Sequence, residues 1–255
     1  MEKRNENAWN LDTYKAWVER FGEPATFMEV IKKDPFKRVK DIFELGTDFK
    51  GKKVLNLMGS NGNRAVALAV LGAEVTVVDY SEGNAAYAMN LAEAGGISID
   101  YKCMRVEDFE PDFEYDYVFA EMGILHYFTD LSLFFGLCYR SLKENGKCIV
   151  KDFHPVSTKL ISSRGHTAKI RKHKVDGDYF STALVEKKVA FSKYSTGAAD
   201  ETVYLRQWTL GEIVTSAAGS GFWIETLEEN PNQSSEQFDK GIPKTFILRA
   251  EKRSV

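Results

Sequence analysis

Between residues 53 and 153, short apolar segments alternate with segments that have the composition of helices. The apolar segments have the length of strands and lie at 53–59, 74–81, 99–109, 115–123 and 147–153. The segments between them each end at a glycine and lie at 63–72, 83–96 and 130–146. Because the strand-like segments are apolar runs rather than alternating patterns, they predict a parallel sheet covered by helices on both faces.

The chain before this region has a helical pattern. Residues 8–49 show apolar side chains near helical spacing, and Gly22 supplies a stop for the first helix. A second helix is predicted over 36–45. These residues therefore form a helical element that precedes the sheet.

The alternation ends after residue 153. Residues 155–205 contain no strand–helix unit, and the segments 178–197 and 201–209 have the pattern of short antiparallel strands. A helix is predicted next, at 210–222, and two final strands follow. These strands, 223–230 and 244–252, are joined by a loop that is short for a helical crossover, which favours an antiparallel hairpin. We therefore expect one α/β domain with an inserted β segment.

Composition limits the class of protein. The formal net charge of -3 argues against a protein that wraps nucleic acid, and the basic run at 169–174 is more typical of a solvated segment. The three cysteines have no spacing typical of a metal site or a disulfide framework, so no metal is predicted. No signal-peptide pattern and no apolar stretch of about 20 residues occurs, so we expect a cytoplasmic protein that does not span a membrane.

A turn with glycines follows the first strand, and a carboxylate ends the second. Small residues such as Gly59 and Gly62 allow a ligand to approach the backbone closely, and amides at a helix N-terminus can bind its polar groups. Asp79 lies where a carboxylate can accept hydrogen bonds from both hydroxyls of a ribose. Together these features predict a nucleoside-containing cofactor at the carboxyl ends of the strands.

The spacing of the glycines helps to choose the cofactor. A dinucleotide site requires the pattern G-x-G-x-x-G, in which the helix N-terminus faces a pyrophosphate. The turn here has only Gly59 and Gly62, with the polar Ser60 and Asn61 between them. A nucleoside without phosphate needs less glycine, so S-adenosylmethionine is favoured over NAD.

Several segments resemble successive motifs of the class I S-adenosylmethionine-dependent methyltransferases, in the same order and spacing. They are VLNLMGSNGNRAVALAVLGAEVTVVDYS, EMGILHYFTDL, LKENGKCIVKDFHP and RQWTLGEIVTSAAGSGFWIETLEENP. The resemblance extends from about Lys52 to the C-terminus and is greatest to the bacterial small-molecule branch. It implies a Rossmann-like, seven-stranded, mostly parallel sheet with a C-terminal antiparallel hairpin. Within a single domain, 1–255, it implies a helical lid (1–49), a cofactor-binding core (50–154), a substrate-covering β insert (155–207) and a C-terminal helix and hairpin (208–255).

The resemblance also implies which residues contact the cofactor. By position in the motifs these are Gly59, Ser60, Asn61 and Gly62 near the methionine portion, Asp79 on the ribose, Tyr80, Val106 and Glu107 around the adenine, and Glu121 and Met122 under the sulfonium. The chain departs from the family pattern at four places. Asn56 replaces an acidic residue, Met58 and Ser60 stand where glycines are common, and Arg105 replaces a frequent acidic residue.

Methyl transfer from a sulfonium is an in-line displacement, so the protein mainly aligns the acceptor and excludes water. A base is needed only where the acceptor atom carries a proton. Candidates in the loops after the fourth and fifth strands are His126, Tyr127 and His154. Aromatic residues in the segments predicted to cover the site are candidates for binding the acceptor, and they are Tyr14, Trp17, Tyr179, Phe180 and Trp208.

The sequence therefore predicts a methyltransferase that acts on an oxygen or nitrogen atom of a small molecule. Three alternatives stay open. The basic run at 169–174 is the feature that favours an RNA methyltransferase. The departures at Asn56 and Ser60 leave room for a protein that binds the cofactor without catalysis. An NAD-dependent oxidoreductase is the weakest alternative, because of the glycine spacing.

Overall fold

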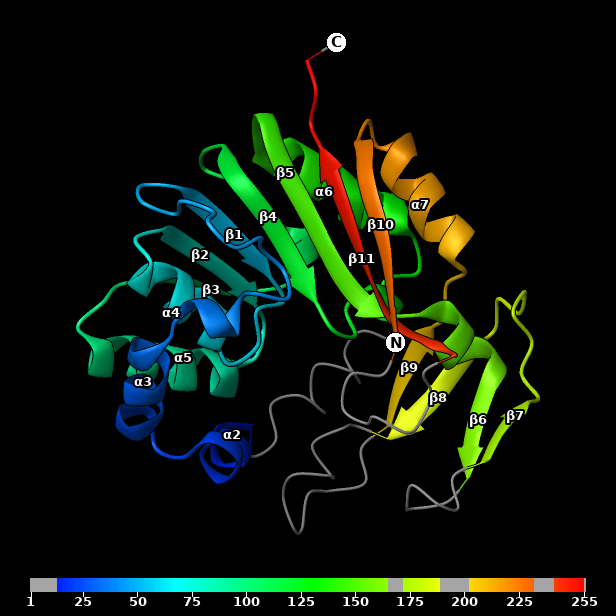
Figure 1. Ribbon diagram of the computed structural model, residues 1–255, viewed down its shortest axis with the longest axis horizontal. Helices are drawn as coiled ribbons and strands as arrows, with labels where there is room; N and C mark the ends of the chain where they lie inside the picture. Colours follow the sequence, from blue (N-terminus) through cyan, green and yellow to red (C-terminus); the bar gives the residue numbers. More distant parts are fainter. Residues whose placement is uncertain (1–12, 165–171, 189–201, 232–240, 255) are drawn as a thin grey trace.

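A seven-stranded sheet with the order β10-β11-β5-β4-β1-β2-β3 forms the centre of the molecule (Figure 1). The structure, a computed structural model, describes residues 13–164, 172–188, 202–231 and 241–254. The strands of this sheet are β1 (Lys53–Leu57), β2 (Glu74–Asp79), β3 (Asp100–Cys103), β4 (Tyr115–Glu121), β5 (Leu142–Phe153), β10 (Trp223–Pro231) and β11 (Pro243–Glu251). Strands β1 to β5 pair in parallel, and β11 pairs antiparallel with both β5 and β10. The predicted parallel sheet with a C-terminal hairpin is confirmed.

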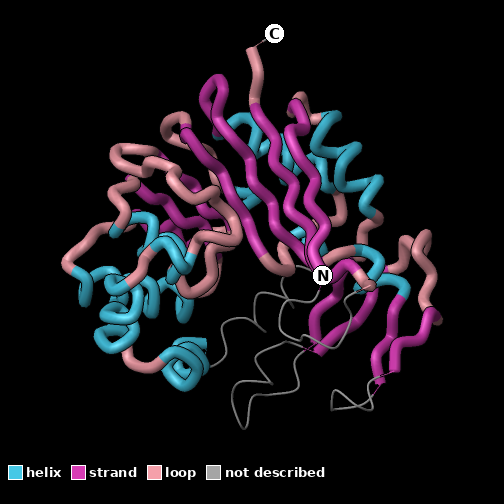
Figure 2. Tube along the Cα trace, in the orientation of Figure 1, coloured by secondary structure: helices cyan, strands magenta, loops and turns pink. Residues whose placement is uncertain are grey.

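Helices cover both faces of this sheet (Figure 2). The first face is covered by α4 (Asn63–Val70) and α5 (Glu82–Gly95), together with α2 (Thr13–Phe21) and α3 (Pro24–Lys33). The second face is covered by α6 (Leu131–Ser141) and α7 (Leu210–Gly219). Among the described residues, no helix is both long and apolar enough to cross a membrane.

The alternation of side chains along a strand explains why central strands such as β1 and β2 are mostly apolar. In β1, Val54 packs in the cluster that contains α4 and α5, whereas its neighbour Leu55 packs in the cluster that contains α6. Both side chains are fully buried. Because successive side chains point to opposite faces, a strand that is covered on both sides needs apolar residues at consecutive positions.

The N-terminal region differs from the prediction in its second helix. That helix is α3, at Pro24–Lys33, and not the segment 36–45. Pro24 stands in the first turn of α3, where its missing amide hydrogen is not needed. Pro35 restricts the residue before it and separates α3 from a short 3₁₀ helix, η1 (Phe36–Arg38). Residues 39–45 bury Ile42 and Phe43 without forming an α-helix.

The helix predicted at 130–146 is shorter than expected. Helix α6 ends at Ser141, and β5 begins at Leu142 rather than at residue 147. The pairing of β4 with β5 shifts register between Tyr115 and Tyr117, so the intervening residues of β5 bulge. Asn145 has a left-handed backbone with φ of 60° in this bulge. A local distortion of this kind leaves little trace in a hydrophobic pattern.

Two separate two-stranded sheets form the described part of the insert. The first pairs β6 (Ile161–Arg164) with β7 (Lys172–Val175), after a short π-helical segment, η4 (Val156–Leu160). The second pairs β8 (Leu184–Lys188) with β9 (Thr202–Arg206). The pairing of the later strands matches the sequence-based expectation, whereas the β6–β7 pair was not predicted. Figure 1 shows α2 and the insert at the end of the sheet toward which the parallel strands point.

Candidate active site

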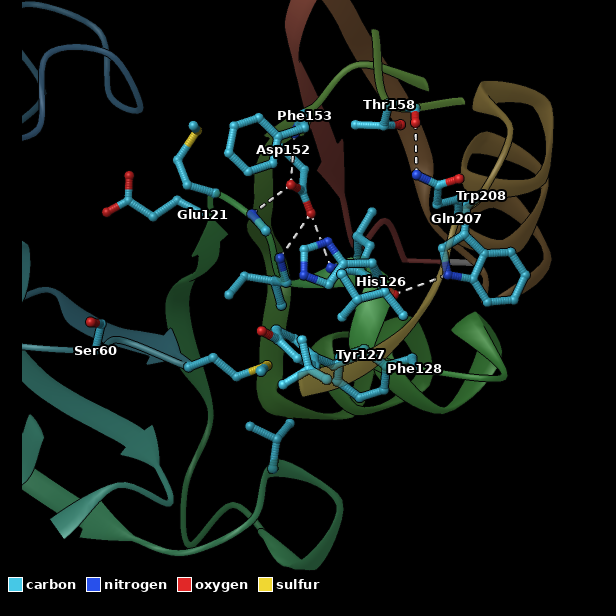
Figure 3. A pocket seen from close by; sticks show the side chains of 18 of the residues that line it. Ser60, Glu121, His126, Tyr127, Phe128, Asp152, Phe153, Thr158, Gln207 and Trp208 are labelled. Atoms are coloured by element: carbon cyan, nitrogen blue, oxygen red, sulfur yellow. Dashed lines mark hydrogen bonds between the residues drawn. The ribbon is translucent and has the colours of Figure 1, made fainter. Parts of the chain in front are cut away.

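A cavity of about 510 Å³ lies at the carboxyl ends of β1, β2, β4 and β5. The strand order reverses between β1 and β4, and ligands of open α/β sheets bind at such a reversal. Many residues predicted to contact the cofactor line this cavity, namely Ser60, Asp79, Tyr80, Val106, Glu107, Glu121 and Met122. In Figure 3, Ser60 and Glu121 lie on one side of the cavity, Trp208 and Gln207 lie on the other, and His126 lies between them.

Asp79 is the buried carboxylate of the cofactor side. Its Oδ2 accepts a hydrogen bond from the Ser60 amide at 3.0 Å. Its Oδ1 accepts from the Ser81 amide at 3.0 Å and from Asn84 Nδ2 at 3.2 Å. Burial raises the pKa of Asp79, and these three hydrogen bonds oppose the increase. Since a carboxylate has about four acceptor positions, Oδ2 keeps one for a ligand hydroxyl.

The two glycines of the turn allow the chain to pack closely. A Cβ at Gly59 would lie 2.5 Å from Asn56 Oδ1, and a Cβ at Gly62 would lie 2.5 Å from the Cβ of Ala88 on α5. Gly62 also has a left-handed backbone, with φ of 68°. Gly59, Asn61 and Gly62 are not part of the cavity wall. These residues shape the turn, and their contact with the cofactor stays a prediction.

Two positions where glycines are common in the family pattern do take the glycine-like backbone. Met58 has φ of 50° and Ser60 has φ of 52°, although neither is glycine. Both side chains line the cavity. The hydroxyl of Tyr101 donates to the carbonyl of Ser60 at 2.7 Å and holds the turn against β3. The departures from the pattern therefore change the side chains of the turn but not its path.

The N-terminal helix α2 reaches the cofactor side through one hydrogen bond. Trp17 is buried, and its Nε1 donates to Asn84 Oδ1 at 2.8 Å. The amide of the same Asn84 donates to Asp79, so α2 is linked to the carboxylate through one side chain. Trp17 itself does not line the cavity. Its position is that of a residue that orients Asn84.

Glu121, at the end of β4, belongs to a network of four charged side chains. It forms an ion pair with Arg64 of α4, and Arg64 also pairs with Asp41 at 2.5 Å. Lys151 of β5 donates to Asp41 at 2.6 Å. Burial raises the pKa of Glu121 to about 7, against the opposing charge of Arg64. For Asp41, burial would raise the pKa, but Arg64 and Lys151 lower it to about 2.

The loop after β4 is held by Asp152 of β5 (Figure 3). This buried carboxylate accepts hydrogen bonds from the amides of Gly123, Ile124 and Leu125, at 2.6, 3.0 and 3.0 Å. The three amides begin the short 3₁₀ helix η3 (Leu125–Tyr127), so Asp152 fixes the helix that carries His126. Burial lowers the pKa of His126, and the charge of Asp152 opposes this decrease. His126 is thus favoured as a neutral imidazole at pH 7.

The insert supplies the other side of the cavity. Val203 and Leu205 of β9 and Lys187 of β8 lie on its wall. Trp208 directly follows the insert, and its Nε1 donates to the carbonyl of Leu125 at 2.9 Å, which ties this end of the insert to the loop of His126. Gln207 Nε2 donates to the carbonyl of Thr158 at 2.7 Å. These contacts bring segments that are 83 and 49 residues apart in sequence to one cavity.

His126 and Tyr127 line the cavity, whereas His154 does not. It is buried, its Nδ1 accepts from the Val156 amide at 3.1 Å, and its Nε2 lies 2.6 Å from Glu229 Oε1. Because both ring nitrogens contact other groups of the protein, His154 connects η4 with β10. Its proposed role as a base finds no support in this geometry.

The aromatic residues predicted to bind the acceptor separate into two groups. Trp208 lines the cavity, whereas Tyr14, Tyr179 and Phe180 do not. The Tyr179 hydroxyl accepts from the Leu210 amide at 3.0 Å, and the Tyr14 hydroxyl accepts from Asn90 at 2.9 Å. Both hydroxyls therefore hold elements of the fold together.

Some residues of the cavity were not singled out from the sequence. They are Asn84, Asp152, Phe153, Thr158, Lys187 and Gln207. Asp152 stands at the end of the fifth predicted strand, and its position could have indicated a site residue as that of Asp79 did. Phe153 ends the same strand, and the others lie in a helix or in the insert, where no periodic pattern indicates which side chains face a cavity.

The fold, the turn and the buried carboxylate define a nucleoside-binding α/β protein, and comparison with known proteins specifies its class. Residues 54–146 match the family described as "Methyltransferase domain". The matched segment contains the turn, Asp79 and the loop of His126. Over these residues the chain is similar to a methyltransferase domain of the class I, S-adenosylmethionine-dependent type, whose methyl donor is S-adenosylmethionine.

Individual proteins are similar to part of this chain or share its fold. A ubiquinone biosynthesis O-methyltransferase of Bradyrhizobium sp. (strain ORS 278) is 36% identical over 100 residues, a match that covers 39% of each chain. An S-adenosylmethionine-dependent methyltransferase structure from Listeria monocytogenes, described as putative, has a TM-score of 0.65 at 22% identity, over 86% of this chain and 98% of that one. The structure of a magnesium protoporphyrin IX methyltransferase from Synechocystis PCC 6803 with bound cofactor has a TM-score of 0.58 at 15% identity, over 98% and 95% of the two chains. The structural likenesses show the common fold.

Proposed function

We propose that this protein transfers a methyl group from S-adenosylmethionine to an oxygen or nitrogen atom of a small molecule. The observation that carries the proposal is the continuity of the cavity. One wall is built by the turn after β1 and by Asp79, and the opposite wall is built by the insert. A cofactor and an acceptor can therefore meet without leaving the protein, as group transfer requires.

The charges of the cavity fit the methyl donor. S-adenosylmethionine carries a sulfonium and an ammonium group, and the carboxylates of Asp79 and Glu121 lie on the cofactor side. Asp79 keeps an acceptor position for a ribose hydroxyl, and Ser60, Tyr80 and Val106 line the wall beside it. The bound donor supplies a methyl group on a positively charged sulfur that is ready for displacement.

The residues of this chain have to hold the acceptor, remove its proton and keep water away. His126 lies in the cavity between the two walls, and its lowered pKa favours the form that can accept a proton. Asp152 holds the backbone of the His126 loop and so fixes the direction of the imidazole. Apolar side chains of the insert, such as Val203 and Leu205, cover the acceptor side and exclude water.

The acceptor itself is proposed from the size of the cavity and from the relatives. A volume of about 510 Å³ suits a small molecule beside a cofactor. The relative named above acts in ubiquinone biosynthesis, and the chain matches 39% of its length. We include a lid function for the N-terminal helices, acceptor binding by the insert and a cytoplasmic location in this proposal. The three free cysteines suit a reducing compartment.

The alternatives receive less support. The described part of the basic run 169–174 belongs to β7 (Lys172–Val175), and Lys174 does not line the cavity. A protein that binds the cofactor without catalysis would need the same cofactor-binding residues. It would not need a base on the cavity wall that faces the insert. The presence of His126 on the cavity wall favours turnover.

Two measurements test the proposal. Isothermal titration should show binding of S-adenosylmethionine and none of NAD, and Asp79→Asn should weaken the binding. Incubation of the protein with S-adenosylmethionine and a panel of phenols, carboxylic acids and amines should form S-adenosylhomocysteine only when an acceptor is present. Binding of NAD alone would contradict the proposal, whereas cofactor binding with no product across the panel would favour the non-catalytic alternative.

A further inference from the structure

Two buried cations lie behind the acceptor side of the cavity, and neither takes part in the chemistry proposed above. Lys159 of η4 is 6% exposed, and Arg206, the last residue of β9, is 8% exposed. Neither side chain lines the cavity. Burial and the charge of Arg206 lower the pKa of Lys159. Because the burial of two like charges is unfavourable, their presence at this place in the fold requires an explanation.

Both cations bind the segment that joins the insert to α7. Lys159 Nζ donates to the carbonyls of Ser181 and Gln207, at 2.7 and 2.9 Å. Arg206 Nη1 donates to the same carbonyl of Gln207, and its Nη2 donates to Glu212 Oε1 at 2.9 Å. Glu212 is the third residue of α7, and its carboxylate also caps that helix. The backbone at Gln207 is therefore fixed from η4, from β9 and from α7.

The next residue, Trp208, reaches the loop of the proposed base (Figure 3). The guanidinium of Arg206 lies over its ring, with Cζ 4.4 Å from the ring centroid. Trp208 Nε1 donates to the carbonyl of Leu125 at 2.9 Å, and the amide of Leu125 donates to Asp152. Leu125 directly precedes His126 in η3. The backbone that carries His126 is thus held at an amide by β5 and at a carbonyl by Trp208.

The imidazole of His126 is closely packed in this arrangement. A Cβ at Gly123 would lie 3.1 Å from His126 Cε1 and 3.3 Å from Phe153 Cε2, so the imidazole lies against the backbone beside that ring. Burial lowers the pKa of His126. Of the charged groups that face it, Asp152 of β5 raises this pKa and Lys187 of β8 lowers it further. A shift of η3 would therefore change both the direction of the imidazole and its contact with water.

We propose that Trp208 is a positioning residue that holds His126 in the direction needed for catalysis, and that Arg206 and Lys159 keep Trp208 in place. The inference rests on the function proposed above, in which His126 accepts the proton of the acceptor. It gives the insert a second role besides covering the acceptor, because the base is aligned only while the junction of the insert with α7 is intact. The two buried cations specify a single arrangement of that junction, although the burial of charge is unfavourable.

An NMR titration tests the alignment of His126 without an acceptor. The chain has four histidines, and the imidazole signal of His126 is identified by its absence in His126→Gln. Trp208→Phe keeps an aromatic ring and removes the donor to Leu125. Water should then reach the imidazole more easily, so the pKa of His126 should rise toward the ordinary value of 6.5. In turnover, the acid limb of the pH–rate profile should move to higher pH by the same amount, which a purely structural role would not produce.

Trp223→Phe is the matched control. Trp223 also has an arginine over its ring, Arg253 at 4.2 Å, but it is exposed on β10 and does not line the cavity. This variant should leave the titration of His126 as it is in the wild type. Both variants should bind S-adenosylhomocysteine within about twofold of the wild-type affinity, because neither removes a hydrogen bond of Asp79. That binding also shows that the variants are folded.

The two cations are tested through the indole hydrogen of Trp208, whose exchange with solvent should be slow because it is bound to the carbonyl of Leu125. Arg206→Lys keeps the charge but loses the planar guanidinium, and it should speed this exchange by about tenfold or more. Lys159→Met should do the same. Lys174→Met, at an exposed lysine of the insert, is the control and should leave the exchange unchanged.

The possible results separate the inference from the proposed function. An unchanged titration of His126 in Trp208→Phe, or an equal change in Trp223→Phe, would overturn the inference. Unchanged indole exchange in Arg206→Lys or in Lys159→Met would show that the altered residue does not hold Trp208. Failure of the wild type to bind S-adenosylhomocysteine would overturn the proposed function, whereas the NMR titration would still decide whether Trp208 holds His126.

Discussion

At the scale of single residues, Gly62 shows why the turn after β1 needs glycine. A Cβ at this position would lie 2.5 Å from the Cβ of Ala88, and φ is 68°. Gly96 offers a comparison, because its φ is 65° but a Cβ there would meet no atom within 4 Å. Both positions require a left-handed backbone, and only Gly62 also requires the space.

We therefore predict that Gly62→Ala destabilises the protein more than Gly96→Ala does. The difference should be about 1–3 kcal/mol, since overpacking against α5 adds to a backbone penalty that the two variants have in common. Urea unfolding of the two variants and the wild type measures it. Equal free energies of unfolding for the two variants would show that the turn moves away from α5 without strain.

His126 carries a second prediction at this scale. Its side chain lines the cavity, and burial lowers its pKa, so the neutral form should persist below pH 6.5. With an acceptor that carries a proton, His126→Gln should lower kcat by about 10²- to 10⁴-fold. The acid limb of the pH–rate profile, set by protonation of the imidazole, should disappear in the variant. His154→Gln is the control, and should change stability without removing that limb, because His154 lies outside the cavity wall.

At the scale of elements, the attachment of α2 depends on a buried hydrogen bond. Trp17→Phe leaves Asn84 Oδ1 without this donor, and Asn84 is buried. The loss should lower the free energy of unfolding by about 1–3 kcal/mol and weaken cofactor binding, because Asn84 also donates to Asp79.

Tyr14→Phe tests the same prediction on the same helix. It removes an exposed hydrogen bond between the Tyr14 hydroxyl and Asn90, and its effect should stay within about 0.5 kcal/mol. Urea unfolding and titration with S-adenosylhomocysteine measure both variants. The linkage from α2 to Asp79 would be disproved if Trp17→Phe and Tyr14→Phe bound the ligand equally well.

The elements also show how far the sequence predicts this fold. The parallel strands could be predicted because a strand buried on both faces is an apolar run, and β1 and β2 are such runs. The β6–β7 pair could not, because its short strands, such as Ile161–Arg164, are mainly polar. The end of α6 at Ser141 was missed because the sequence continues to resemble a helix as far as Gly146.

At the scale of the whole molecule, the candidate site was predictable where strand ends determine it. Asp79 and Glu121 each end a parallel strand, so their place at one edge of the sheet follows from topology. Which side chains face the cavity depends on distant partners. His154 is held by Glu229, which is 75 residues further along the chain, and no local pattern reveals such a contact.

The charged network gives the last prediction, which concerns the pH dependence of stability in the absence of ligand. Between pH 4.5 and 7 the folded protein keeps a proton on Glu121 that the unfolded chain releases. The contribution of Glu121 to the free energy of unfolding is therefore fully present below pH 4.5. It is lost as the pH rises through 7, and the total loss is roughly 3 kcal/mol. The contribution of Asp41 to stability depends on pH in the opposite direction. It is present above pH 3.8 and is lost as the pH falls through 2.

Urea unfolding at pH 5 and pH 7.5 should separate the two carboxyl groups. Glu121→Gln should remove the loss of stability that the wild type shows between these values, because glutamine cannot ionise. Asp41→Asn keeps Glu121 and should retain part of that loss, and it should abolish the loss of stability that Asp41 causes in the wild type as the pH falls from 3.8 to 2. An identical pH dependence for the wild type and Glu121→Gln would show that Glu121 is already ionised in the protein without ligand.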